Sequence, residues 1–229
     1  MEFQNLGYLL VLLVLLAVAL VIISKLTRDL LFELKYMLPA IIFTTAILAM
    51  INTRLAELQI LLYNPNFLTG KSLLHFPVEE WLFLPVVSLL SFAAYIFAKT
   101  HLTSFEKPNV FVIVSLVLLF LTGAITWFSR QKLYPFSIFM LLTIYFGYTI
   151  FRNRFKNHLT SFYLGFAIAV IPFFILKATL FTLPAIIPDN NFMLGISLMN
   201  MPVEEFAYFF LLLLINTTIY EYLRERRLF

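Results

Sequence analysis

Residues 66–80 read NFLTGKSLLHFPVEE, and residues 191–205 read NFMLGISLMNMPVEE. The two stretches lie 125 residues apart, and nine of their fifteen positions are identical. Both end in Pro-Val-Glu-Glu and lead directly into a long apolar stretch. Self-similarity at a fixed spacing indicates a structural repeat. The chain therefore contains two copies of one unit, each marked by a pair of glutamates at the start of an apolar segment.

Composition places the chain in a membrane. Of its 229 residues 62% are hydrophobic and 12% are charged, against about a quarter charged in soluble domains. A net charge of +4, spread over short loops, indicates membrane topology rather than a nucleic-acid surface. Because there is no cysteine, disulfides and thiolate metal sites are excluded.

Seven stretches are long and apolar enough to cross about 30 Å of hydrocarbon. None alternates with period two, so we expect helices. The predicted fold is all-α, a polytopic membrane protein of about seven transmembrane helices. The predicted spans lie near residues 6–24, 36–53, 77–98, 109–128, 133–151, 159–181 and 202–222.

The order of the spans predicts how the repeats are related. The motif helices are the third and seventh spans, so they run in the same direction. This predicts two parallel three-helix repeats, 1–100 and 132–229, joined by a connecting span within 101–131 and related by a pseudo-twofold axis along the membrane normal. Both glutamate pairs would then lie at one depth, where they could line a shared pocket.

Basic residues predict the orientation. With seven spans, eleven Lys and Arg residues fall on the side of the C-terminus and five on the other. Because basic loops favour the cytoplasm, we expect a cytoplasmic C-terminus, an outer N-terminus and the long loops 54–76 and 182–201 on the outer side.

The candidate catalytic residues are Glu79, Glu80, Glu204 and Glu205. One interpretation is structural, because a carboxylate in a first turn suits the helix dipole. A cap needs only one carboxylate, however, and ionisable groups beside lipid indicate function. Apolar surroundings and a second carboxylate nearby both favour the protonated form, which is a general acid. The sequence does not distinguish the proton donor among the four.

Candidate substrate-binding residues follow the motifs. Aromatic faces stabilise a developing carbocation, and a polar group within an apolar helix needs a partner. The predicted substrate-binding residues are Trp81, Phe83, Phe206, Tyr208 and Asn216.

The repeated Pro-Val-Glu-Glu, the aromatic helices after it and Tyr220-Glu221 near the end of the last span resemble the membrane-embedded lycopene cyclase family. The likeness covers nearly the whole chain and is to the fused form of the bacterial two-subunit and fungal-type enzymes. It implies an isomerase of carotenoid biosynthesis that closes the ψ-ends of lycopene, or a related linear carotenoid, into β-ionone rings. A protonated glutamate would start the reaction, and a carbocation would follow without net redox change.

The resemblance also implies partners and a location. We expect the lipid bilayer, a linear carotenoid and other carotenoid-pathway membrane enzymes as partners, and a bacterial inner (cytoplasmic) membrane as the location. No Gly-x-Gly-x-x-Gly fingerprint is present, so no bound dinucleotide or flavin is expected. The resemblance implies no metal.

Three other readings compete with the cyclase. Parallel repeats and intramembrane carboxylates also suit a proton-coupled transporter. A retinal-binding protein would be expected to carry a lysine in its last helix, which residues 202–222 lack. A non-catalytic carotenoid-binding membrane subunit would need the same apolar pocket.

Overall fold

The computed structural model describes residues 2–27, 30–74, 76–102, 108–152 and 155–226. Within them, seven helices are long and apolar enough to cross a membrane, as predicted. Two short 3-10 helices, Lys156–His158 and Asn190–Phe192, lie between them. The seven helices are α1 (Glu2–Leu26), α2 (Leu30–Glu57), α3 (Val78–His101), α4 (Pro108–Phe128), α5 (Leu133–Phe151), α6 (Leu159–Thr182) and α7 (Glu204–Arg226).

The second helix is longer than its apolar stretch. We predicted 36–53 from hydropathy, whereas α2 continues at both ends into charged sequence. Three of its charged residues have partners: Glu33 accepts hydrogen bonds from Tyr220 and Arg224, and Arg54 pairs with Glu57 at 2.6 Å. These contacts let the helix extend past the hydrocarbon-length segment.

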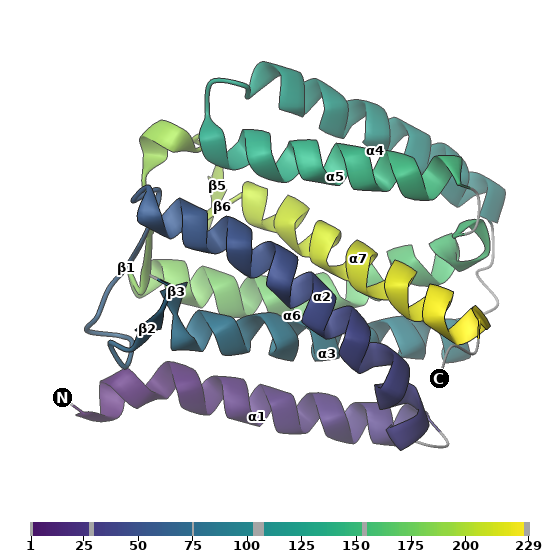
Figure 1. Cartoon of the computed structure of the whole chain (residues 1–229), viewed down its shortest axis with the longest axis horizontal. Coiled ribbons are helices and arrows are strands. Elements are labelled where there is room, and N and C mark those ends of the chain that lie inside the picture. Colours follow the sequence, from purple (N-terminus) through teal and green to yellow (C-terminus); the bar gives the residue numbers. More distant parts are fainter. Residues whose placement is uncertain (1, 28–29, 75, 103–107, 153–154, 227–229) are drawn as a thin grey trace.

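The helices form an interlocked pair of three-helix units (Figure 1). Helices α1, α2 and α3 end 125 residues before α5, α6 and α7, respectively. The middle helix of each unit packs chiefly on the motif helix of the other unit: α2 lies along α7, and α6 lies along α3. Each motif helix is therefore enclosed by both units, which brings the two motifs together. The boundaries 1–100, 101–131 and 132–229 stay a prediction.

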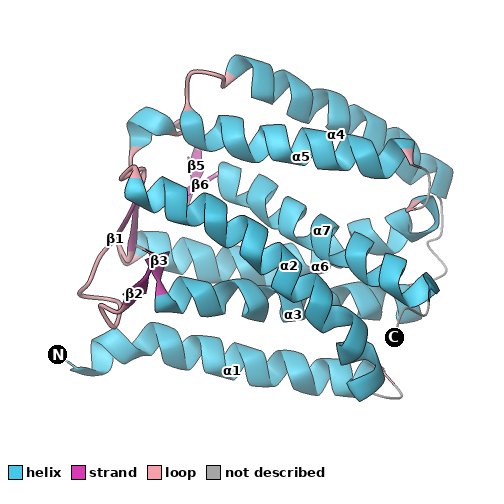
Figure 2. Ribbon diagram, in the orientation of Figure 1, coloured by secondary structure: helices cyan, strands magenta, loops and turns pink. Residues whose placement is uncertain are grey.

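Short strands gather at the end of the bundle where both motif helices begin (Figure 2). Strand β1 (Leu61–Tyr63) pairs antiparallel with β4 (Ile186–Pro188), and Leu62 lies opposite Ile187. These two residues are themselves 125 positions apart, so the pseudo-twofold axis passes between them. The pairing of β1 with β4 crosses the axis and joins the two long loops. The sequence predicted these loops but not the pairing between them.

A hairpin precedes each motif helix. The first is β2 (Ser72–Leu73) with β3 (Phe76–Pro77), and the second is β5 (Ser197–Leu198) with β6 (Met201–Pro202). The hairpins share their backbone form, because Gly70 and Gly195 both have positive φ, 74° and 84°. Glycine adopts this region without steric cost, which explains why both copies keep it.

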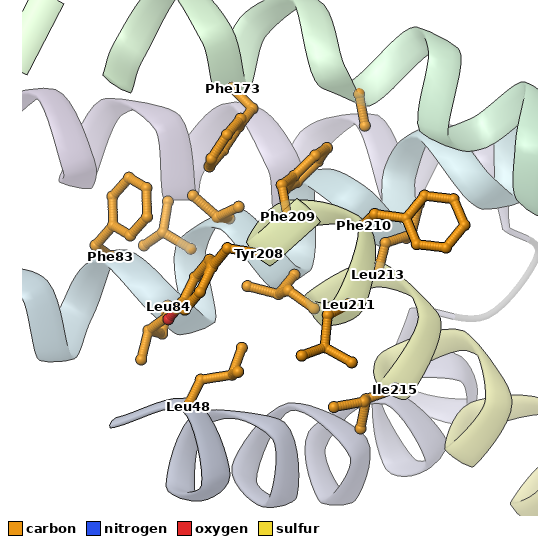
Figure 3. Close-up of a cluster of buried hydrophobic side chains, with 14 of the residues drawn as sticks. Leu48, Phe83, Leu84, Phe173, Tyr208, Phe209, Phe210, Leu211, Leu213 and Ile215 are labelled. Atoms are coloured by element: carbon orange, nitrogen blue, oxygen red, sulfur yellow. The ribbon is translucent and has the colours of Figure 1, made fainter. Parts of the chain in front are cut away.

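Aromatic and aliphatic side chains pack together in the centre of the bundle (Figure 3). Phe173 of α6 stacks on Phe209 of α7 with ring centroids 4.2 Å apart, and Phe83 of α3 lies 6.4 Å from Phe173. In contrast, α1 and α4 expose most of their apolar side chains, as expected for helices that face lipid.

One basic residue used to predict the orientation lies within a helix rather than in a loop. We counted Lys177 with the outer loops, but it lies inside α6 and is 5% exposed. It is not a loop charge, and the outer side keeps four basic residues against eleven. Of those eleven, Arg28, Lys107, Arg154 and Arg227 lie outside the described residues.

Candidate active site

Glu80 lies in the first turn of α3, directly after the β2–β3 hairpin. Its side chain is 2% exposed. One carboxylate oxygen accepts a hydrogen bond of 2.7 Å from the Tyr8 hydroxyl of α1, and the other lies 3.4 Å from Nζ of Lys177. A buried carboxylate needs such partners because an unpaired charge in an apolar interior is costly.

Glu205 repeats this arrangement at the start of α7. It is 3% exposed, and one oxygen accepts a hydrogen bond of 2.6 Å from the Tyr134 hydroxyl of α5. Its other oxygen lies 3.7 Å from the same Lys177 ammonium. One lysine therefore faces both carboxylates across the pseudo-twofold axis.

The rest of this centre is also buried. Lys177 Nζ lies 4.3 Å from the centroid of the Phe83 ring, and Asn52 of α2 donates a 2.8 Å hydrogen bond to the Tyr208 hydroxyl. A cavity of about 10 Å³ lies between these groups, enough for about one water molecule. We call this set the central cluster: Asn52, Tyr63, Glu80, Phe83, Tyr134, Lys177, Glu205 and Tyr208.

Glu79 and Glu204 have a different surrounding. Each accepts a hydrogen bond from a backbone N–H ten residues earlier, Thr69 at 2.5 Å and Leu194 at 2.6 Å. Their second carboxylate oxygens are buried and have no hydrogen-bond partner among the described residues. These two glutamates tie the loop before each hairpin to its helix, and they do not face the central cluster.

Two buried glutamates, each paired with a tyrosine and both facing one lysine, form a group that can hold and release a proton. A family model described as lycopene cyclase matches residues 5–98 and 131–223, the two halves that carry the motifs. The chain belongs to the lycopene cyclase family. Membership supports a role in carotenoid cyclisation. Comparisons with curated proteins and with solved structures give no match.

A large apolar groove lies beside the central cluster, and Tyr8 is the residue that connects the two. The groove has a volume of about 630 Å³, lies between α1, α3 and α6, and falls in the size range of small-molecule sites. Tyr8 lines it and donates to Glu80, so this tyrosine separates the groove from the carboxylate. Phe173 and Phe209 line the groove on the opposite side from α1.

The five predicted substrate-binding residues divide between several places. Phe83 and Tyr208 lie in the central cluster. Trp81 donates its indole N–H to Leu73 O of the hairpin at 3.2 Å, and Phe206 stacks on a neighbouring α6 ring. Asn216 lies three turns deeper in α7, where its amide donates to Ser88 at 2.8 Å and its carbonyl oxygen has no partner among the described residues.

A second polar cluster lies at the opposite ends of α3 and α7. Tyr95 donates to Glu221 at 2.7 Å, and Lys99 lies 2.5 Å from the same carboxylate. Tyr220 donates to Glu33, which also pairs with Arg224 at 3.1 Å. The Tyr220-Glu221 pair of the family resemblance is thus far from the four motif glutamates, and its contacts link α7 to α2 and α3.

Four polar residues of this centre were not predicted from the sequence: Lys177, Tyr8, Tyr134 and Asn52. For Lys177 a signal was present, because a basic residue inside the apolar stretch 159–181 indicates a functional group. Sliding the chain by 125 residues then leads from Lys177 to Asn52. The two tyrosines lie 126 residues apart and carry no local motif, so only the packing of α1 and α5 reveals them.

Proposed function

We propose that the chain cyclises the ψ-ends of lycopene, or of a related linear carotenoid, to β-ionone rings by acid catalysis. The observation that carries this proposal is the burial of Glu80 and Glu205 around Lys177, separated by Tyr8 from a large apolar groove. The groove supplies apolar surface for a polyene, and the cluster supplies the only kind of reagent that the reaction needs, a proton.

The reaction balances without a co-reactant. One carboxylic acid of the Glu80 and Glu205 pair gives its proton to the terminal double bond of the polyene, leaving a tertiary carbocation. The next double bond attacks this cation and closes a six-membered ring. A ring proton then leaves to a carboxylate, the β double bond forms, and the acid is restored, so the product is an isomer of the substrate.

Aromatic side chains suit the cationic stage. The faces of aromatic rings attract cations, and the Phe83 ring already lies under the Lys177 ammonium. Tyr208 lies across the same cavity. We propose that these two rings stabilise the positive charge, and that Trp81, Phe206 and Asn216 act through the packing of the helices.

The four motif glutamates take two roles in this proposal. Glu80 and Glu205 do the acid–base work, because they face the central cluster. Glu79 and Glu204 hold the loops, because their contacts are to backbone N–H groups. We further propose that the protein lies in the inner bacterial membrane with a cytoplasmic C-terminus. Its proposed partners include other membrane enzymes of the carotenoid pathway.

Pigment analysis in a lycopene-accumulating bacterial host tests the proposal. The wild type should convert lycopene to a monocyclic or dicyclic product, and Glu80→Gln or Glu205→Gln should stop conversion while the protein still accumulates in the membrane. If the well-expressed wild type leaves lycopene untouched, the cyclase proposal fails. If pigment copurifies with it unchanged, the chain is a carotenoid-binding subunit instead.

A further inference from the structure

The ammonium group of Lys177 breaks the symmetry of the repeat. At the offset of 125 residues Glu205 corresponds to Glu80, whereas Lys177 corresponds to Asn52 and Tyr208 to Phe83. The amide of Asn52 donates to the Tyr208 hydroxyl at 2.8 Å. The centre therefore contains two carboxylates and one ammonium, although the backbone around it is duplicated.

Both carboxylates divide their oxygens in the same way. In each, one oxygen accepts from a tyrosine hydroxyl, and the other is directed toward Lys177 at 3.4 or 3.7 Å. A proton on either glutamate leaves the ammonium attracted mainly to the other one. Because the three groups are 2–5% exposed, little solvent screens this coupling.

A count of charges follows from this geometry. With both carboxylates ionised and Lys177 protonated, the central cluster carries one uncompensated negative charge, which is costly in a low-dielectric interior. One added proton makes the cluster neutral, and a second would leave it positive. The cluster is thus built to take up one proton.

We propose that Lys177 is a positioning residue that couples Glu80 and Glu205 into one acid with a single transferable proton, so that the chain has one reaction centre rather than one per repeat. This rests on the proposed cyclase function. It follows that the two ends of a linear carotenoid react in turn, and that a monocyclic product precedes any dicyclic one.

Other titratable groups lie around this centre, and the first test, Lys177→Met, leaves all of them unchanged. Burial, together with the nearby Glu80 and Glu205 carboxylates, raises the pKa of the Tyr63 hydroxyl in the loop well above its ordinary value. Lys132 lies beyond Glu204, with Nζ 2.5 Å from Met193 O. The remaining groups around the centre are Tyr8, Tyr134, Tyr208, Glu79 and Glu204.

The first test is Lys177→Met, compared with the wild type as the rate of lycopene conversion by isolated membranes across pH. Without the ammonium, the two carboxylates no longer share one opposite charge. The pH dependence of the rate should therefore differ from that of the wild type, a change that loss of packing alone would not produce. A folded Lys177→Met protein with the wild-type profile overturns the inference.

The second test moves the charge across the pseudo-twofold axis. Lys177→Asn alone should show the changed profile. Combining it with Asn52→Lys, Phe83→Tyr and Tyr208→Phe exchanges the asymmetric pairs and should restore the wild-type profile. This fourfold variant decides the matter even if the single variants fail to accumulate. A fourfold variant that accumulates but does not cyclise overturns the inference, whereas failure of the wild type to cyclise counts against the proposed function alone.

Discussion

The division of labour within each glutamate pair is open to a direct test, Glu79→Gln against Glu80→Gln. Glu79 makes one hydrogen bond, from the Thr69 N–H, and glutamine keeps the accepting oxygen. A hydrogen bond to a charged group contributes about 1.5–3 kcal/mol to stability, and one between neutral groups contributes about 0.5–1.5 kcal/mol. Glu79→Gln should therefore lower the free energy of unfolding by about 1–2 kcal/mol. Cyclisation should slow by less than about tenfold, because the reacting proton is elsewhere.

Glu80→Gln changes the proposed acid itself. Loss of general acid–base catalysis costs about 10²- to 10⁴-fold in rate, so conversion should fall by at least about a hundredfold. Initial rates of lycopene conversion in membranes of equal protein content, with thermal unfolding in detergent as the stability measure, separate the two effects. Glu204→Gln is the matched control and should behave as Glu79→Gln does. If folded Glu79→Gln is as inactive as Glu80→Gln, the assignment of roles is refuted.

Four further variants probe helix packing, the groove and the Tyr8 hydroxyl. An added Cβ at Gly165 would lie 2.9 Å from the Tyr95 Cα, so Gly165→Ala should destabilise by about 1–3 kcal/mol through overpacking. Gly147→Ala, whose nearest contact would be 3.6 Å, should leave the unfolding temperature unchanged or raised. Ala169→Phe should fill part of the groove and raise the lycopene concentration needed for half-maximal rate; an unchanged value argues against the groove as the substrate site. Tyr8→Phe should slow cyclisation by about tenfold to a hundredfold, the worth of a hydrogen bond to a charged group, and a wild-type rate would show that the hydroxyl is dispensable.

Span length and the repeat were predictable because both are properties of the linear sequence. Hydropathy predicted seven helices, and the offset of 125 residues predicted that the motif helices are equivalent. The ends of α2 were not predictable in this way, because Glu33 is kept in the helix by Tyr220 and Arg224 of α7. The β1–β4 pairing was missed for a similar reason, since each strand is three residues long and forms only against the other.

Only some of the residues of the site could be predicted from the sequence. The glutamates could be found because charge beside apolar sequence is a local signal. The different surroundings of the two glutamates in each pair could not be predicted, because they depend on which side of the helix the hairpin backbone occupies. Tyr8 and Tyr134 lie near the starts of distant helices, where a tyrosine is also common as an interface residue. Only tertiary packing shows that each hydroxyl meets a carboxylate.

The fused chain gives the centre a composition that a symmetric dimer of one repeat could not have. In a twofold dimer the same residue must occupy both sides of the axis. Two lysines would neutralise both carboxylates, and no added proton would be needed. Two asparagines would leave two negative charges together and no cation to hold them. With Lys177 on one side and Asn52 on the other, one negative charge remains. In the proposed mechanism the site then needs a single proton, which each ring closure would use and return.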